Sequence, residues 1–292
     1  MNSLKKNLQS ILLKSLGKLS AIATPQLRKL LGKGIGTVLR WMSSKRFQIT
    51  VSNLQEAYPE KSSHWIRTTA YSSYHNLGIV LAEILAFQYL SNKQLVDIIQ
   101  FTNIELLGDL YGRSNGMILL SGHFGNWELL AYSAGLLSGI PINIVVAPQH
   151  NPIANEYINE FRSRHNNRIV PMTNAARNIV HILQNNGVVA MLADQAANSS
   201  KNIFVDFFHR PASTYDAPAA LALKFKFPLI IGFAVRQASG AYLVTLQEIK
   251  YDDLEYSKEG IAELTRRHVA ILEREIRNHP DQWSWQHKRW KI

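Results

Sequence analysis

The chain has 292 residues, of which 46% are hydrophobic, carries a formal net charge of +11 and contains no cysteine. This length allows one large α/β domain with additional helices. Without cysteine there can be no disulfide, thiolate nucleophile or cysteine-ligated metal, although the compartment stays open.

The positive charge is concentrated near the start of the chain. Ten lysines and arginines precede Glu56 with no acidic residue among them, whereas the remainder is about neutral. Leucine and isoleucine recur between these charges at helical spacing, with a break at Pro25. No apolar run approaches the ~20 residues of a membrane-spanning helix. Lys14 and Lys18 also interrupt the apolar centre that a signal peptide would need.

We therefore expect residues 1–45 to form a basic amphipathic helical segment that associates with an anionic membrane surface. The alternative is a solvated segment whose apolar face packs on the main domain, but ordinary surface helices mix both signs of charge. Binding of nucleic acid is disfavoured, because this part of the chain is rich in leucine and has only Trp41 and Phe47 as aromatic residues.

Residues 46–292 are expected to form one α/β domain. After a junction at 47–59, residues 63–90 should form one or two helices, and 78–90 is apolar except for Glu83 and Gln88. From residue 117 strands and helices alternate, which predicts a mostly parallel central sheet flanked by helices on both faces. The expected strands are 117–121, 142–147, 168–171, 188–193, the extended 203–208, and a hairpin of 229–236 with 242–248; the expected helices are 153–164, 175–184, 215–225 and 261–278, and 194–202 is a polar loop.

The first of these strands leads into the segment M-I-L-L-S-G-H-F-G-N-W-E-L-L, which starts at Met117. His123 and Glu128 can meet only if the histidine lies in the loop and the glutamate in the first helical turns, since on one helix they would be ~140° apart. Loops beyond the carboxyl ends of strands are where open α/β sheets bind ligands. A histidine held there by a carboxylate can remove a hydroxyl proton. The alternative is a buried histidine bonded to a backbone carbonyl, with an ordinary acidic residue near a helix start.

The block S-G-H-F-G-N-W-E resembles the His-x4-Asp/Glu block of the lysophospholipid acyltransferase superfamily, in particular the lipid A late acyltransferases (lauroyl and myristoyl transferases) and their phosphatidylinositol mannoside relatives. The resemblance extends over about residues 46–291 in four ordered blocks. The other three blocks are Asn53-Leu54 with Pro59-Glu60, Asp194-Gln195 followed by 203–208 and 211–214, and the terminal 281–291. Asp206, His209 and Ala196-Ala197 depart from the usual pattern of the third block, which affects the expected acceptor contacts more than the catalytic pair.

The resemblance implies a role for each matching residue. His123 would be the general base and Glu128 the acid that orients it, while the acceptor hydroxyl attacks an acyl thioester directly. Backbone N–H groups near 122–125, or an arginine, would stabilise the oxyanion. The substrate-binding residues would be Arg162, Arg164, Asp194, Gln195 and Asn126, with arginine suited to phosphate by its forked donors. The terminal tryptophan–cation cluster is expected to be structural, with His287 a secondary candidate.

Together these features predict a membrane-surface O-acyltransferase at the cytoplasmic face of a bacterial inner membrane, peripheral or monotopic. The donor would be acyl carrier protein, or CoA, and the acceptor a lipid A precursor-like glycolipid; no metal and no cofactor are implied. An acyltransferase for a lysophospholipid or a phosphatidylinositol mannoside, and a non-catalytic lipid-binding protein, are the alternatives. Gly-x-Ser-x-Gly, His-Glu-x-x-His and P-loop motifs are absent, which leaves serine hydrolase, zincin and nucleotide hydrolase without support.

Overall fold

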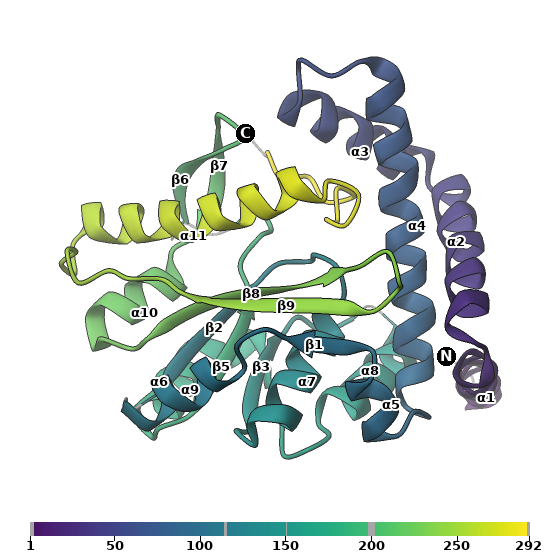
Figure 1. Cartoon of the computed structure of the whole chain (residues 1–292), viewed down its shortest axis with the longest axis horizontal. Helices are drawn as coiled ribbons and strands as arrows, with labels where there is room; N and C mark the ends of the chain where they lie inside the picture. The colour runs from purple at the N-terminus through teal and green to yellow at the C-terminus, as the bar shows by residue number, and fades with distance from the viewer. Residues whose placement is uncertain (1–2, 114–115, 150, 198–201, 291–292) are drawn as a thin grey trace.

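A computed structural model describes residues 3–113, 116–149, 151–197 and 202–290 of the chain, with the backbone alone for 3–6 and 174. Its centre is a seven-stranded sheet in the order β1-β9-β8-β2-β5-β3-β4 (Figure 1). Five neighbouring strands are parallel: β8 (Leu229–Arg236), β2 (Met117–Ser121), β5 (Val188–Leu192), β3 (Ile142–Val146) and β4 (Arg168–Pro171). At one edge β9 (Tyr242–Glu248) pairs antiparallel with β8, and the short β1 (Ile99–Phe101) lies parallel to β9.

Side chains alternate between two buried faces of this sheet. Ile118 and Leu120 of β2 belong to one apolar cluster, whereas Met117 belongs to the other. The first cluster is completed by α9 (Ala175–Gln184), α10 (Ala217–Phe225) and α11 (Lys258–Asn278), and the second by α5 (Asn92–Val96), α6 (Glu105–Arg113), α7 (Trp127–Ser138) and α8 (Pro152–Arg162). Burial on both faces explains why the parallel strands are nearly continuous apolar runs. The predicted fold class, a mostly parallel sheet with helices on both faces, is confirmed.

Four long helices begin the described chain, and the short α5 follows them before β1. The four are α1 (Ser3–Ile22), α2 (Pro25–Met42), α3 (Ser44–Ala57) and α4 (Ser63–Phe87). Figure 1 shows α4 between the sheet and the pair α1 and α2. The α2–α4 contact is close because glycines meet there: a Cβ on Gly32 would lie 2.4 Å from the Cα of Ile79, and one on Gly36 would lie 2.2 Å from the carbonyl oxygen of Tyr74. Among the described residues, no helix is long and apolar enough to cross a membrane.

Several local expectations differ from the structure. The junction at 47–59 is largely the helix α3. Of the one or two helices expected at 63–90, the structure forms one, which ends at Phe87. The extended segment 203–208 is β6 (Asn202–Phe207), which pairs with an unexpected strand β7 (Arg210–Tyr215), so that the following helix starts only at Ala217. The polar loop at 194–202 is described up to 197 and from 202, and Lys291 of the terminal block lies outside the described residues. The division into residues 1–45 and 46–292, whose border lies inside α3, stays a prediction.

Candidate active site

The loop between β2 and α7 places His123 at the carboxyl end of the central strands. Gly125 has a φ of 55°, and a Cβ at this position would lie 1.7 Å from the carbonyl oxygen of Ala234, so only glycine fits here. Asn126 caps the helix, because its side chain accepts a hydrogen bond from the backbone N–H of Leu129 at 3.0 Å. His123 therefore lies in the loop and Glu128 in the first helical turn, as expected.

Asp194 is the carboxylate that binds His123. It follows β5, which pairs directly with β2, so the two residues leave adjacent strands at the same edge of the sheet. The Nδ1 atom of His123 lies 2.8 Å from Oδ1 of Asp194, and the backbone N–H of His123 donates to Oδ2 at 2.7 Å. The indole N–H of Trp283 donates to the same Oδ2 at 2.9 Å. An ionised carboxylate only accepts, so Nδ1 carries the proton and Nε2 of the neutral ring is unprotonated.

The pKa shifts of both groups agree with a hydrogen bond between an ionised Asp194 and the ring of His123. Burial alone would raise the pKa of Asp194, which is 2% exposed, but the charge and hydrogen bonds of His123 and the Trp283 indole bring it down to about 2. Burial alone would lower the pKa of His123, but the charge and hydrogen bond of Asp194 outweigh it and raise the pKa above its usual value. The His123 side chain keeps 26% of its surface exposed, so a substrate can reach the ring.

Glu128 has a different partner from the one we predicted. Its carboxylate accepts two hydrogen bonds from Arg162 of α8, from Nε at 2.8 Å and from Nη2 at 2.5 Å, and a third from the indole of Trp127 at 3.1 Å. Glu128 points towards α8 because α7 and α8 pack side by side, whereas Asp194 comes from the strand beside His123. In this structure Asp194, predicted as a substrate ligand, makes the hydrogen bond to the ring of His123 that we expected from Glu128. A role of Glu128 in orienting His123 stays a prediction.

The two arginines predicted to bind substrate both make contacts within the protein. Arg162, with a side chain 11% exposed, binds Glu128 and also donates from Nη1 to Asn159 at 3.1 Å. Arg164 donates to the carbonyl of Phe87 at 3.0 Å and stacks over the ring of Tyr132. These bonds tie α8 to α7 and to the end of α4. Substrate binding by either arginine stays a prediction.

Asn126 and Gln195, both predicted to bind substrate, lie in different surroundings. Asn126 is fully buried, and its Nδ2 donates to Glu83 of α4 at 2.8 Å, so in this structure its contacts are within the protein. Substrate binding by Asn126 stays a prediction. The Nε2 atom of Gln195, by contrast, lies 3.4 Å from both ring nitrogens of His123, which places this amide at the site.

A buried polar cluster behind the loop was missed by sequence reasoning. Glu83 accepts hydrogen bonds from Arg236 at 2.6 Å and from the hydroxyl of Tyr242 at 2.5 Å, in addition to the one from Asn126. Burial and the charge of Glu83 both raise the pKa of Tyr242, so its hydroxyl stays a donor. The signal in the sequence was Glu83 itself, an acid within an apolar helix, which needs partners when buried.

Four backbone N–H groups at the expected oxyanion hole are hydrogen-bonded within the protein. The N–H of His123 binds Asp194, and the N–H groups of Phe124, Gly125 and Asn126 bind the carbonyls of Gly122, Gln282 and Ala234 at 2.7, 2.9 and 3.3 Å. These four donors are therefore occupied in this structure, and the expected oxyanion contacts near 122–125, or from an arginine, stay a prediction.

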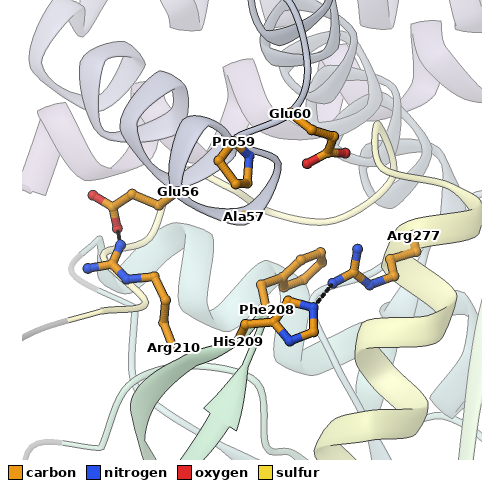
Figure 2. A pocket seen from close by; sticks show the side chains of 8 residues that line it. All are labelled: Glu56, Ala57, Pro59, Glu60, Phe208, His209, Arg210 and Arg277. Carbon is orange, nitrogen blue, oxygen red and sulfur yellow. Dashed lines mark hydrogen bonds and ion pairs between the residues drawn. The ribbon is translucent and has the colours of Figure 1, made fainter.

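A cavity of about 400 Å³ lies elsewhere, between the end of α3 and the β6–β7 turn (Figure 2). Arg210 pairs with Glu56 across it, and Arg277 lies beside His209. The residues that line it are Glu56, Ala57, Pro59, Glu60, Phe208, His209, Arg210 and Arg277. Since no predicted site residue lines this cavity, it is separate from the His123 site.

Replacing Glu128 by glutamine is expected to lower stability, because it leaves the buried guanidinium of Arg162 without its counter-charge. Loss of one partner of a buried pair costs about 3–5 kcal/mol, and we expect the low end of this range because Arg162 keeps its bond to Asn159. Thermal and urea unfolding of the purified variant measure it. A variant as stable as the parent would show that the pair contributes no net stability.

Comparisons with known proteins identify the same family as the four motif blocks of the sequence. A family model described as bacterial lipid A biosynthesis acyltransferase matches residues 6–292. The chain is similar to the lipid A biosynthesis lauroyltransferase of Escherichia coli (strain K12), with 21% identity over 264 residues that cover 89% of this chain and 84% of that protein. It shares 23% identity, with the same coverage, with the lipid A biosynthesis palmitoleoyltransferase of the same strain and the lipid A biosynthesis acyltransferase of Shigella flexneri.

Proposed function

This chain belongs to the bacterial lipid A biosynthesis acyltransferase family, and from that premise we propose that it moves a fatty acyl chain from a thioester to a hydroxyl of a lipid A precursor-like glycolipid. The acyl donor in this proposal is acyl carrier protein, with CoA as the alternative. The observation that carries the proposal is the hydrogen bond between His123 and the buried Asp194 at the carboxyl edge of the sheet.

The proposed reaction has two steps. Nε2 of His123 takes the proton of the acceptor hydroxyl as the oxygen attacks the thioester carbonyl carbon, giving a tetrahedral intermediate and an imidazolium that Asp194 stabilises. The intermediate then collapses, the carbon–sulfur bond breaks, and the imidazolium returns its proton to the departing thiolate. The result is an ester and a free thiol, with His123 neutral again. No nucleophile from the protein is needed, because the attacking oxygen belongs to the acceptor.

The side-chain amide of Gln195 is the group we propose for the oxyanion. Its Nε2 lies beside the ring of His123, and the backbone N–H groups of residues 123–126 are occupied. A neutral amide can donate to the developing charge at any pH at which His123 is a base. The ion pair of Glu128 and Arg162 lies near His123 and has opposed effects on it. The charge of Glu128 raises the pKa of His123, and the charge of Arg162 lowers it.

We propose further that the outer surface of α1 and α2 lies on the anionic cytoplasmic leaflet of the inner membrane, so that the protein is peripheral or monotopic. This surface exposes large apolar side chains, among them Leu30 at 66%, Trp41 at 81% and Met42 at 73%. The same part of the chain carries basic residues and no acidic one. Apolar side chains insert at the interface, and each nearby cation adds ~1 kcal/mol on anionic lipid.

Vesicle binding tests this membrane proposal. The double substitution Leu30→Glu with Trp41→Glu is expected to weaken binding to anionic vesicles by about tenfold or more, because it removes apolar contact and adds two repelled charges. Leu137→Glu, on α7 and also exposed, is the matched control and should bind as the parent does. Equal binding by the double variant and the control would contradict the orientation proposed here.

The acceptor and donor are tested by reconstituting the transfer. The purified chain is incubated with an acyl thioester of either acyl carrier protein or CoA. The acceptor is a lipid A precursor or, in a separate reaction, a lysophospholipid, and the masses of the lipid products are measured by mass spectrometry. One added acyl group on the lipid A precursor supports the proposal. Transfer to the lysophospholipid alone would contradict the acceptor, and binding of lipid without turnover of any thioester would contradict catalysis.

A further inference from the structure

The end of the chain forms one wall of the catalytic loop. Trp283 makes an isolated antiparallel bridge with Phe124. On either side of it, the N–H of Gly125 donates to the carbonyl of Gln282 at 2.9 Å, and the N–H of Ser284 donates to the carbonyl of His123 at 3.0 Å. The segment after α11 thus runs beside the loop as a short extra strand, and it brings a side chain to the pair of His123 and Asp194.

Trp283 is held firmly in this wall. Its side chain is 2% exposed, and its ring packs edge-on against Phe207, with centroids 5.5 Å apart, and against Trp285, with centroids 4.7 Å apart. Held in this way, its indole N–H donates to Oδ2 of Asp194 at 2.9 Å. Oδ1 of the same carboxylate is left for the imidazole.

We infer that Trp283 is a positioning residue for the acyl transfer proposed above, on which this inference rests, and that it acts by fixing the rotation of the Asp194 carboxylate. Two donors on Oδ2, the indole and the backbone N–H of His123, keep Oδ1 aimed at Nδ1. Without the indole the carboxylate can turn about its last torsion, and the tautomer with a free Nε2 is less firmly held.

The chemistry of the indole fits this task. Trp283 offers a donor without an acceptor and without a charge. A lysine or arginine at the same place would form an ion pair with Asp194 and weaken the field that this carboxylate exerts on the imidazole. The indole orients the anion, and the charge of Asp194 remains available to stabilise the imidazolium of His123.

The test compares two tryptophan-to-phenylalanine changes in the same segment. Trp283→Phe keeps the aromatic packing and removes the donor to Asp194, so we expect kcat to fall about tenfold or more with little change in KM for either substrate. Trp285→Phe is the matched control, since its indole donates to the carbonyl of Pro280 instead, and kcat should stay within about twofold of the parent. Equal losses in the two variants would overturn the inference.

A double-mutant cycle separates positioning from folding. In an Asp194→Asn background the indole has lost the anion that it orients, so adding Trp283→Phe should cost less than about twofold further. If Trp283 had only a structural role, Trp283→Phe would lower kcat by the same factor in the parent and in the Asp194→Asn background. That result would overturn the inference, even if the variants are less stable. The His123→Ala variant tells this outcome from failure of the proposed acyl transfer. If His123→Ala is inactive but the cycle shows no coupling between Trp283 and Asp194, only the role of Trp283 is refuted.

Discussion

Replacing Asp194 by asparagine is expected to lower kcat about 10⁴-fold, as the equivalent change does in a serine protease triad. An amide can present its NH₂ group to Nδ1 of His123, which favours the tautomer that carries its proton on Nε2 and cannot accept another. Steady-state rates of acyl transfer measure the loss. The residual activity should also extend to lower pH, because the charge that raises the pKa of His123 is gone and the ring stays neutral further into acid.

Glu128→Gln is the control that decides which carboxylate acts on the base. Glu128 is bound to Arg162, so its replacement should reduce stability but leave most of kcat, measured at a temperature where the variant is folded. The reverse pattern, with Asp194→Asn nearly fully active and Glu128→Gln inactive, would show that Glu128 orients His123 during catalysis and that the contact with Asp194 does not matter.

Replacing His123 by alanine is expected to abolish transfer without unfolding the protein. Loss of a catalytic base in comparable sites costs about 10⁶-fold in kcat, and no other described side chain with a free basic nitrogen contacts Asp194. The fold should survive because the ring is partly exposed and because the backbone N–H of residue 123 and the indole of Trp283 still satisfy the buried carboxylate.

Rates and unfolding curves of the purified His123→Ala variant test both parts of this expectation. Near-full activity would mean that the proposed mechanism is wrong. Loss of activity with loss of structure would instead assign the His123 side chain to stability, through its hydrogen bond to the buried Asp194. The backbone bonds of residue 123 hold the loop to Asp194 and Ser284. The alanine variant keeps those backbone bonds, which is why we expect an inactive but folded protein.

The sequence alone determined the parts of this protein that depend on local pattern. Continuous apolar runs such as 117–121 and 188–193 predicted buried parallel strands, because strands covered on both faces need no polar alternation. The glycines on both sides of His123 predicted a loop at a strand end, and the order of four motif blocks predicted the family. The short β1 and the strand β7 escaped prediction, since three residues hold too little periodicity and Arg210–Tyr215 is largely polar.

Only the tertiary structure decided which charged groups meet. A spacing of five residues made Glu128 the natural partner of His123, but hydrogen bonds follow strand neighbours, and β5 delivers Asp194 to β2 from far along the chain. Trp283 reaches the same carboxylate from the last segment of the fold. Local pattern records how each residue faces its own strand or helix, and at most which strands adjoin through a short turn, as in the hairpin of 229–236 with 242–248. It holds no information on which strands far apart in the chain lie side by side, and that adjacency brought Asp194 to His123.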